Sequence, residues 1–210
     1  MAESAAHPMF ARVYTRVAEI SERRGAAGHR RKLLAGLRGR VIEVGAGSGA
    51  NFRHYPASVA EVLAVEPEPY LRERAQHAAK DATVTVSVAR GDADGLPDGE
   101  SFDAGVVALV LCTVPDQDAA LAELYRVIRP GGELRFYEHV RSHSTWEARF
   151  QRLADATLWP RLAGGCHLAR DTTAAIERAG FRIEVCERFS YSPAPLLPAD
   201  PHILGIACRP

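Results

Sequence analysis

The sequence lacks an excess of charge of either sign. Its 210 residues include 26 lysines and arginines and 26 aspartates and glutamates, so the formal net charge at pH 7 is zero. Because no overall positive field gathers polyanions, we expect no nucleic-acid partner. The one basic cluster, spread over residues 23–40, is interpreted as the solvated face of a helix rather than as a phosphate-binding surface.

Long apolar runs are missing as well. No stretch approaches the roughly twenty apolar residues that cross a bilayer, and the first residues lack the hydrophobic core of a signal peptide. We therefore expect no integral membrane segment and a cytoplasmic location. The length and the hydrophobic content of 47% suit one domain over 1–210, with an ample core and no second, substrate-binding domain.

Cysteine is scarce, with four residues and no C-x-x-C pair. This spacing argues against a zinc knuckle and a disulfide framework, and no metal site is predicted. The thiols of Cys166, Cys186 and Cys208 are expected to pack as small hydrophobic groups. Cys112 follows an apolar run at the edge where ligands are expected, so packing and substrate contact both stay open for it.

The most informative stretch is 41–49, which reads Val-Ile-Glu-Val-Gly-Ala-Gly-Ser-Gly. Glycine adopts positive φ and has no Cβ, so Gly45, Gly47 and Gly49 predict a buried strand that turns tightly around a ligand. A second apolar run, 62–65, ends in Glu66 about twenty residues further on, where a carboxylate could hold a ribose diol. Together these features predict half of a nucleotide-like cofactor site.

The identity of that cofactor is not settled by glycine spacing alone. Gly45, Gly47 and Ala50 also satisfy the G-x-G-x-x-G/A pattern of dinucleotide sites. Glu43, two residues before the first glycine, would repel a pyrophosphate but could face the cationic amino group of S-adenosylmethionine. A nicotinamide cofactor stays an alternative, weakened by the absence of a second domain.

Later stretches follow in a fixed order. The loop 90–97 carries Asp92, which can accept a hydrogen bond from an adenine amine. A long apolar run begins at residues 102–103. The stretch 126–132 then predicts the end of a helix at Pro-Gly-Gly. With the glycine-rich turn, this ordered set resembles the class I S-adenosylmethionine-dependent methyltransferases over almost the whole chain.

Several shorter stretches narrow the resemblance. They are similar to the small-molecule thiol methyltransferases formerly called methyltransferase-like 7 proteins, and more distantly to quinone-biosynthesis and phospholipid methyltransferases. The stretches that carry this likeness are 49–56, 109–116, 136–140, 164–170 and 201–205.

The resemblance and the apolar patterns predict an α/β fold. We expect a Rossmann-like doubly wound sheet, mostly parallel with an antiparallel C-terminal strand and with helices on both faces. Strands are predicted at 41–44, 62–66, 83–88, 104–111, 133–138, 181–189 and 202–208. Helices are predicted from near Ala50, from Pro67 to about Lys80, after an Asp116 cap up to Pro130, and from an Asp171 cap to Gly180.

Two further segments are expected to cover the site. Residues 1–40 are predicted to form an N-terminal helical lid over the cofactor. Residues 142–170 are predicted to form a helical insertion whose large apolar side chains roof the substrate pocket; these are Trp146, Phe150, Leu153, Leu158 and Trp159.

The resemblance implies roles for individual residues toward S-adenosylmethionine and its product S-adenosylhomocysteine. The glycine turn would cradle the methionine portion, Glu66 would bind both ribose hydroxyls, Pro67 would pack on adenine, and the Leu109 carbonyl would accept from the amino group. The cofactor-binding residues implied in this way are Glu43, Gly45, Ala46, Gly47, Gly49, Asn51, Glu66, Pro67, Asp92, Ala93 and Leu109.

Methyl transfer is an in-line displacement at a carbon already activated by the sulfonium, so the enzyme mainly positions the nucleophile. A thiol acceptor, with a free pKa of about 8.5, needs only one nearby base. His139 at the predicted tip of 133–138 is the catalytic candidate, and a structural imidazole bonded to Glu138 or to a loop carbonyl is an equally good interpretation. The candidates for substrate binding are Tyr14, Cys112, His139 and His167.

The sequence thus predicts methyl transfer from S-adenosylmethionine to a small molecule, with a thiol as first choice. The alternatives are an oxygen, nitrogen or carbon acceptor on a quinone, phospholipid or natural-product scaffold, and a catalytically silent S-adenosylmethionine-binding partner subunit. The acceptor and the oligomeric state stay open.

Overall fold

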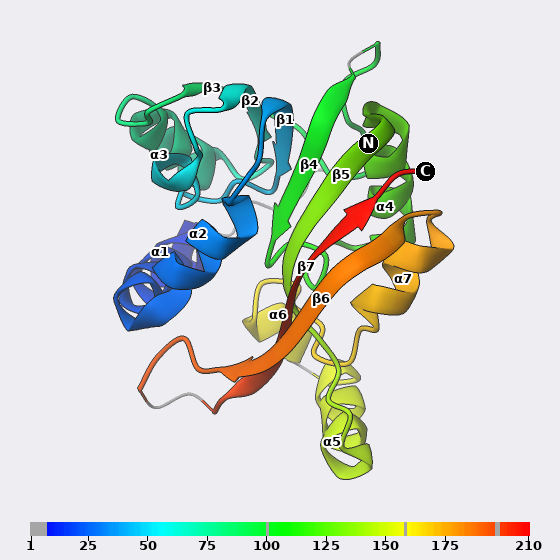
Figure 1. Ribbon diagram of the computed structural model, residues 1–210. Coiled ribbons are helices and arrows are strands. Elements are labelled where there is room, and N and C mark those ends of the chain that lie inside the picture. The colour runs from blue at the N-terminus through cyan, green and yellow to red at the C-terminus, as the bar shows by residue number, and fades with distance from the viewer. Residues whose placement is uncertain (1–7, 100, 158, 196–197) are drawn as a thin grey trace.

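The computed structural model describes residues 8–99, 101–157, 159–195 and 198–210, without the side chains of 8–14, 161 and 162. Seven strands form one sheet in the order β3-β2-β1-β4-β5-β7-β6 (Figure 1). The strands β1 to β5 are parallel, and β7 runs antiparallel to both of its neighbours. This confirms the predicted doubly wound, mostly parallel sheet. The strands are β1 (Gly39–Val44), β2 (Val59–Val65), β3 (Thr85–Ala89), β4 (Phe102–Ala108), β5 (Ile128–His139), β6 (Arg182–Tyr191) and β7 (Asp200–Cys208).

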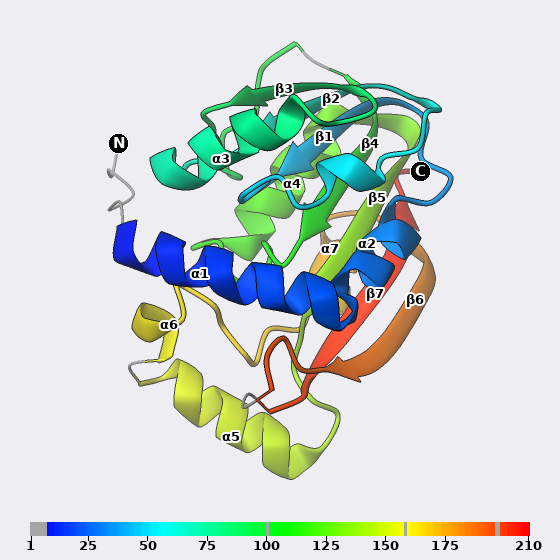
Figure 2. The same cartoon turned by 90° about the vertical axis from the view of Figure 1, so that its left-hand side faces the viewer.

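Helices cover both faces of this sheet (Figure 2). The helices α1, α2 and α3 lie on one face, and α4 and α7 lie on the other. A π-helical turn at Glu22–Ala26 joins α1 to α2. Among the described residues, no helix is both long enough and apolar enough to cross a membrane. The helices are α1 (Pro8–Ser21), α2 (Ala27–Leu34), α3 (Pro69–Ala79), α4 (Gln117–Val127), α5 (Thr145–Asp155), α6 (Trp159–Leu162) and α7 (Thr172–Arg178).

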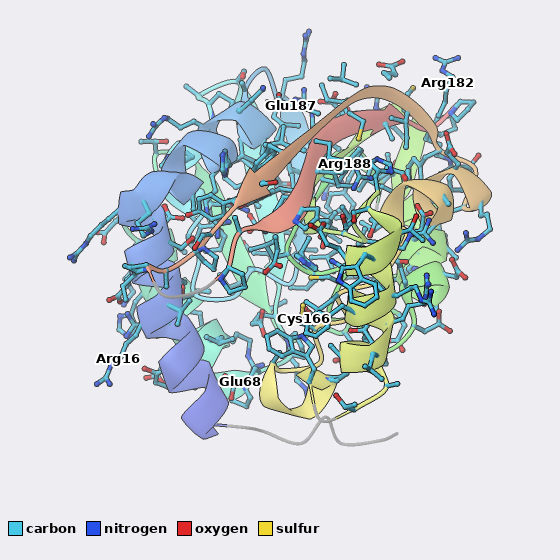
Figure 3. The ribbon with its side chains drawn as sticks, turned by 90° about the horizontal axis from the view of Figure 1, so that it is seen from below. Arg16, Glu68, Cys166, Arg182, Glu187 and Arg188 are labelled. Atoms are coloured by element: carbon cyan, nitrogen blue, oxygen red, sulfur yellow. The ribbon has the colours of Figure 1, made fainter. Side chains whose placement is uncertain are left out.

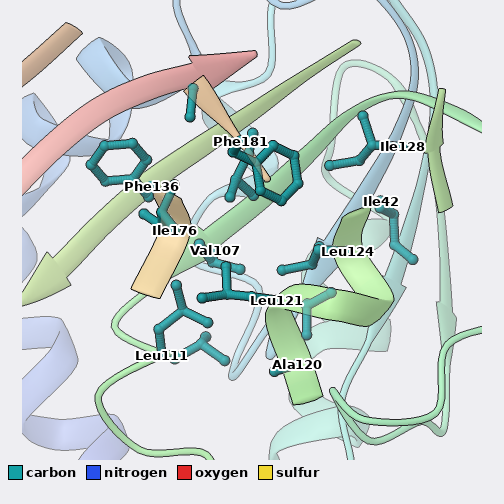
Figure 4. Packing of buried hydrophobic residues seen from close by; sticks show 14 of the residues in the cluster. Ile42, Val107, Leu111, Ala120, Leu121, Leu124, Ile128, Phe136, Ile176 and Phe181 are labelled. Atoms are coloured by element: carbon teal, nitrogen blue, oxygen red, sulfur yellow. The ribbon is translucent and has the colours of Figure 1, made fainter. Parts of the chain in front are cut away.

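Each face of the sheet has its own apolar core. The apolar stripe of α4 and the buried face of α7 pack against β4 and β5 in one cluster, part of which Figure 4 shows. A second cluster joins α2 and α3 to β1, β2 and the opposite side of β5. Since successive side chains of a strand point to opposite faces, strands buried on both sides read as nearly continuous apolar runs.

The predicted helix caps of α4 and α7 are confirmed. Asp116 accepts hydrogen bonds from the backbone N–H groups of Asp118 and Ala119, and Asp171 accepts one from Ala174. Gly180 follows α7 with a φ of +98°, as expected of the residue that ends a helix.

Other predicted boundaries are wrong. No α-helix follows β1 near Ala50; the chain makes turns and a short 3-10 helix, Phe52–His54, because Pro56 follows closely and holds Tyr55 extended. The helix predicted from Pro67 begins at Pro69, since the carboxylate of Glu68 caps it through the Leu71 N–H. The helix predicted to stop at Pro130 ends three residues earlier, and β5 already begins at Ile128.

Candidate active site

The parallel strands end at one edge of the sheet, and the predicted site residues follow them there. Val44 pairs with Val65 on one side and with Val107 on the other, so the loops after β1, β2 and β4 lie next to each other. Figure 3 views the molecule from this side, with α1 on one flank and with α5 and α6 on the other. Ligands of doubly wound sheets bind at such an edge.

The glycine turn after β1 packs tightly against its neighbours. The N–H groups of Gly45 and Ala46 both donate to the Val65 carbonyl, at 2.9 and 3.1 Å. Gly45 has a φ of +67°, and a Cβ at this position would lie 2.6 Å from Cγ2 of Val110. The turn therefore depends on glycine for its conformation and for its contact with the loop after β4. It borders a small cavity lined by Ala18, Arg30, Glu43, Gly45, Ala46, Gly47, Ser48, Ala50, Asn51 and Ala108.

Glu43 lines this cavity and belongs to a buried polar network. Its carboxylate accepts hydrogen bonds from Asn51 Nδ2 at 2.9 Å and from the Tyr55 hydroxyl at 2.7 Å. Arg30 of α2 donates to Asn51 Oδ1 at 2.8 Å and to Glu22 at 2.6 Å. Burial raises the pKa of Glu43 to about 7, against the opposing effect of its two hydrogen bonds.

Glu66 stands at the end of β2, where the sequence predicts a ribose-binding acid. Its two carboxylate oxygens accept from the Gly47 N–H at 2.8 Å and from the Glu68 N–H at 2.9 Å. Burial raises its pKa. Because a carboxylate oxygen accepts more than one hydrogen bond, both oxygens keep a lone pair for a ribose diol. The residues present therefore fit a nucleoside at this position.

The predicted adenine contacts lie beyond β2 and β3. Pro67 is half-buried beside Glu66, and Ala93 is half-buried against the core. Asp92 is exposed, and its carboxylate makes no hydrogen bond with any described residue. These groups share the edge with Glu66, which is the arrangement an extended nucleoside needs.

The loop after β4 is strained and firmly held. Leu109 has a φ of +62°, and among the described residues no other non-glycine residue has a positive φ. The buried Glu138 carboxylate accepts the next three backbone N–H groups, from Val110 at 2.9 Å, Leu111 at 3.1 Å and Cys112 at 3.2 Å. Backbone strain of this kind is retained where neighbouring groups fix it and is typical of ligand sites.

His139, the last residue of β5, is 6% exposed, and neither of its ring nitrogens has a hydrogen-bond partner among the described residues. Its ring lies edge-on to that of His202, with centroids 5.4 Å apart. Burial, and to a lesser degree His202, lower its pKa to about 4. The predicted bond to Glu138 is not formed, because adjacent residues of a strand point to opposite faces.

The remaining substrate-binding candidates differ in their placement. Cys112 is buried, its thiol contacts that of Cys166, and its carbonyl accepts from the His167 N–H at 2.8 Å. Cys112 and His167 are therefore brought together, with the cysteine packed rather than open to solvent. The side chain of Tyr14 lies outside the described part of the chain.

The predicted roof over the pocket is wrong for α5. Trp146, Phe150 and Leu153 point outward and are exposed, while Ala148 and Gln151 face the body of the protein. The Gln151 side chain accepts from the Ser142 N–H at 2.8 Å and thereby fixes which face of the helix is buried. Trp159 of α6 is also exposed, and Leu158 lies outside the described residues.

Sequence reasoning missed several residues of the site. Arg30 belongs to the basic cluster assigned to a solvated face, yet it is 7% exposed and tied to Asn51. Glu138 and His202 were not predicted to hold the loop after β4 or to contact His139. A carboxylate inside the apolar run of β5 was the one available signal for Glu138, because buried acids are rare without partners.

The sheet order, the glycine turn after β1 and the acid at the end of β2 define a class I S-adenosylmethionine-dependent methyltransferase. A family model described as "Methyltransferase domain" matches residues 42–136. Among solved structures, an S-adenosylmethionine-dependent methyltransferase from Thermotoga maritima is 21% identical with a TM-score of 0.71, covering 96% of this chain and 97% of its own. The N-methyltransferase NodS from Bradyrhizobium japonicum, solved with S-adenosylhomocysteine, is 21% identical with a TM-score of 0.66, covering 90% and 88%.

Curated relatives are closer in sequence. Thiol S-methyltransferase TMT1B of Homo sapiens is 36% identical over 188 residues, which cover 85% of this chain and 75% of the relative. Thiol S-methyltransferase TMT1A of Homo sapiens is 35% identical over 175 residues, covering 80% and 70%. The chain belongs to this methyltransferase family, and it is an enzyme that uses S-adenosylmethionine to methylate a small molecule.

Proposed function

We propose that the acceptor is a small-molecule thiol and that the reaction takes place in the cytoplasm. The observation that carries the acceptor is the identity of 36% to a relative named as a thiol S-methyltransferase, over 85% of the chain. The pairing of a buried, unpartnered imidazole with a strained loop at the same sheet edge supports a reaction site there. The cytoplasmic location rests on the sequence alone.

We assign the cofactor roles from the family resemblance, and the position of each group at the sheet edge supports them. Gly45, Ala46, Gly47 and Gly49 shape the cradle for the methionine portion, above the Glu43 and Asn51 network. Glu66 binds the ribose hydroxyls, and Pro67, Asp92 and the Ala93 amide surround adenine. The Leu109 carbonyl accepts from the amino group. Residues 8–34 act as the lid, since Ala18 and Arg30 line the cavity from α1 and α2.

His139 serves as the proton acceptor. S-adenosylmethionine supplies a methyl carbon activated by a sulfonium, so one sulfur–carbon bond forms as another breaks and the attacking thiol loses its proton. The imidazole is neutral at pH 7 and presents a free lone pair to the S–H group. A pKa of about 4 makes it a weak base toward a free thiol, so the proton moves only as the new sulfur–carbon bond forms and then passes on to solvent.

The test is transfer of a labelled methyl group to a panel of alkyl and aryl thiols, with phenols and amines of matched shape beside them. Asp92 is the residue tested, and Asp94 provides its matched control because it lies in the same loop and is also exposed. We expect Asp92→Ala to raise the KM for S-adenosylmethionine at least about tenfold and Asp94→Ala to leave it unchanged.

A methyl thioether formed only from the thiols supports the proposal. Methylation of phenols or amines alone would overturn the thiol assignment, and cofactor binding without any product would favour a catalytically silent subunit. Replacing His139 with alanine separates the chemistries further, because a thiolate attacks without much help whereas a phenol or carbon acid loses about 10²–10⁴-fold in rate without its base.

A further inference from the structure

Two cysteines that lie far apart in the chain meet at the ligand-binding edge of the sheet. The thiol of Cys112, in the loop after β4, contacts the thiol of Cys166, in the segment before α7. Figure 3 labels Cys166 beside α5 and α6, on the side where the parallel strands end. Both thiols are free, and methyl transfer requires no pair of thiols, so the reaction does not account for this arrangement.

Hydrogen bonds hold the two segments together beside both cysteines. The Cys112 carbonyl accepts from the His167 N–H at 2.8 Å. Arg170 donates to the carbonyls of Leu111 at 2.5 Å and of Pro115 at 3.4 Å, one on each side of Cys112. A disulfide joins Cα atoms about 4.4–6.8 Å apart, and the bond between the Cys112 carbonyl and the N–H that follows Cys166 brings their Cα atoms within that range.

The two thiols differ in their access to solvent. Cys112 is 2% exposed, whereas Cys166 is half-buried. Contact with Cys166 and burial raise the pKa of the Cys112 thiol, so Cys112 stays protonated in the reduced protein. An oxidant in solution therefore reaches Cys166 first, and Cys112 is placed to react with the oxidised sulfur. An accessible cysteine next to a second, resolving cysteine is typical of redox-sensing pairs.

We propose that Cys112 and Cys166 form a reversible disulfide when the protein meets a hydroperoxide, and that this bridge weakens the binding of S-adenosylmethionine. The Cys166 sulfur attacks one oxygen of hydrogen peroxide and the O–O bond breaks, which leaves a sulfenic acid and, with the proton of the thiol, one water. The Cys112 sulfur then attacks the sulfenic sulfur. An S–S bond forms, and the leaving hydroxide takes the Cys112 proton and departs as a second water. Two small thiols reverse the bridge by exchange and leave as their own disulfide.

The bridge acts on the cofactor through the loop after β4. A disulfide holds its sulfur atoms about 2 Å apart, so its formation pulls Cys112 toward the segment before α7. The Cys112 N–H makes the longest of the three bonds to Glu138, at 3.2 Å, and is the first that this pull breaks. The loop then loses part of the support that fixes the strained Leu109. The effect on affinity rests on the role proposed for the Leu109 carbonyl.

The test is treatment of the full-length, fully reduced protein with hydrogen peroxide, followed by measurement of the intact mass and by peptide mapping. We expect the loss of two hydrogen atoms and a peptide pair in which Cys112 is linked to Cys166. The Kd for S-adenosylmethionine, measured by calorimetry on the same samples, should rise at least about threefold through the lost hydrogen bond. Dithiothreitol should reverse both changes.

Cysteine variants separate the two steps. Cys166→Ser should abolish both the bridge and the change in Kd. Cys112→Ser should instead accumulate the sulfenic acid of Cys166, detected as its adduct with dimedone. The matched controls are Cys186→Ser and Cys208→Ser, which remove the other two thiols and should leave the bridge intact.

Three results would overturn the proposal. One is the absence of any bridge in the unaltered protein with excess peroxide. Another is a disulfide that joins other cysteines or two protein molecules. The third is a bridge between Cys112 and Cys166 that leaves the Kd unchanged, since the loop would then not respond to it. None of these measurements needs a methyl acceptor, so they are independent of whether the acceptor is a thiol.

Discussion

Replacing Glu43 with glutamine should change how stability depends on pH. The buried carboxylate has a pKa of about 7 in the folded protein and an ordinary value of 4.5. Between these values the folded state binds a proton that the unfolded state has already lost, so the free energy of unfolding falls as pH rises. Raising the pKa from 4.5 to about 7 corresponds to about 3 kcal/mol. Glutamine fills the same space between Asn51 and Tyr55 without a charge.

The measurement is thermal unfolding of both proteins from pH 4.5 to pH 8 without S-adenosylmethionine. The difference between the two curves should grow by about 3 kcal/mol in favour of Glu43→Gln as pH rises, which is roughly 6–12 °C in Tm for a chain of this size. Any constant difference in hydrogen bonding cancels in this comparison. Glu73→Gln on the exposed face of α3 is the control and should give a curve parallel to the unaltered protein. Parallel curves for Glu43→Gln would refute the assignment of a buried, desolvated acid.

Further predictions concern the neighbouring loops. His139→Asn should show the opposite pH dependence, because the pKa of His139 is about 4 in the folded protein and ordinarily 6.5. The free energy of unfolding of the unaltered protein therefore falls by about 3 kcal/mol as pH falls from 6.5 to 4. The variant should lose less stability in the same unfolding assay. Glu138→Ala leaves three buried N–H groups without an acceptor and should lower the free energy of unfolding in urea by at least about 3 kcal/mol, whereas Glu138→Gln keeps most of it. Gly45→Ala should lower the free energy of unfolding by about 2–4 kcal/mol, through its positive φ and its overlap with Val110, and should abolish the rise in Tm with S-adenosylmethionine. Adding Val110→Ala to this variant should restore part of the stability.

Local patterns were sufficient for the framework of the fold. The apolar runs, the glycine turn and the cap residues Asp116 and Asp171 act through nearest neighbours and hydrogen bonds a few residues apart, so their structural meaning is present in the sequence itself. The order of these elements also placed Glu43, Glu66 and Leu109 at one edge, because parallel strands bring their carboxyl ends together. The doubly wound sheet and its ligand-binding edge could thus be predicted before any coordinates.

The partners of the polar side chains were decided by the tertiary structure. Arg30 reads as one cation in a basic cluster, and only the packing of α2 against the turn after β1 buries it beside Asn51. The support that Glu138 gives to the strained loop depends on the pairing of β5 with β4. The outward apolar face of α5 depends on the Gln151 contact with Ser142. The sequence determined the sheet and its ligand-binding edge, because periodicity and turn chemistry are local; the charges, strain and exposed faces that give the site its chemistry arise from contacts between segments far apart in the chain.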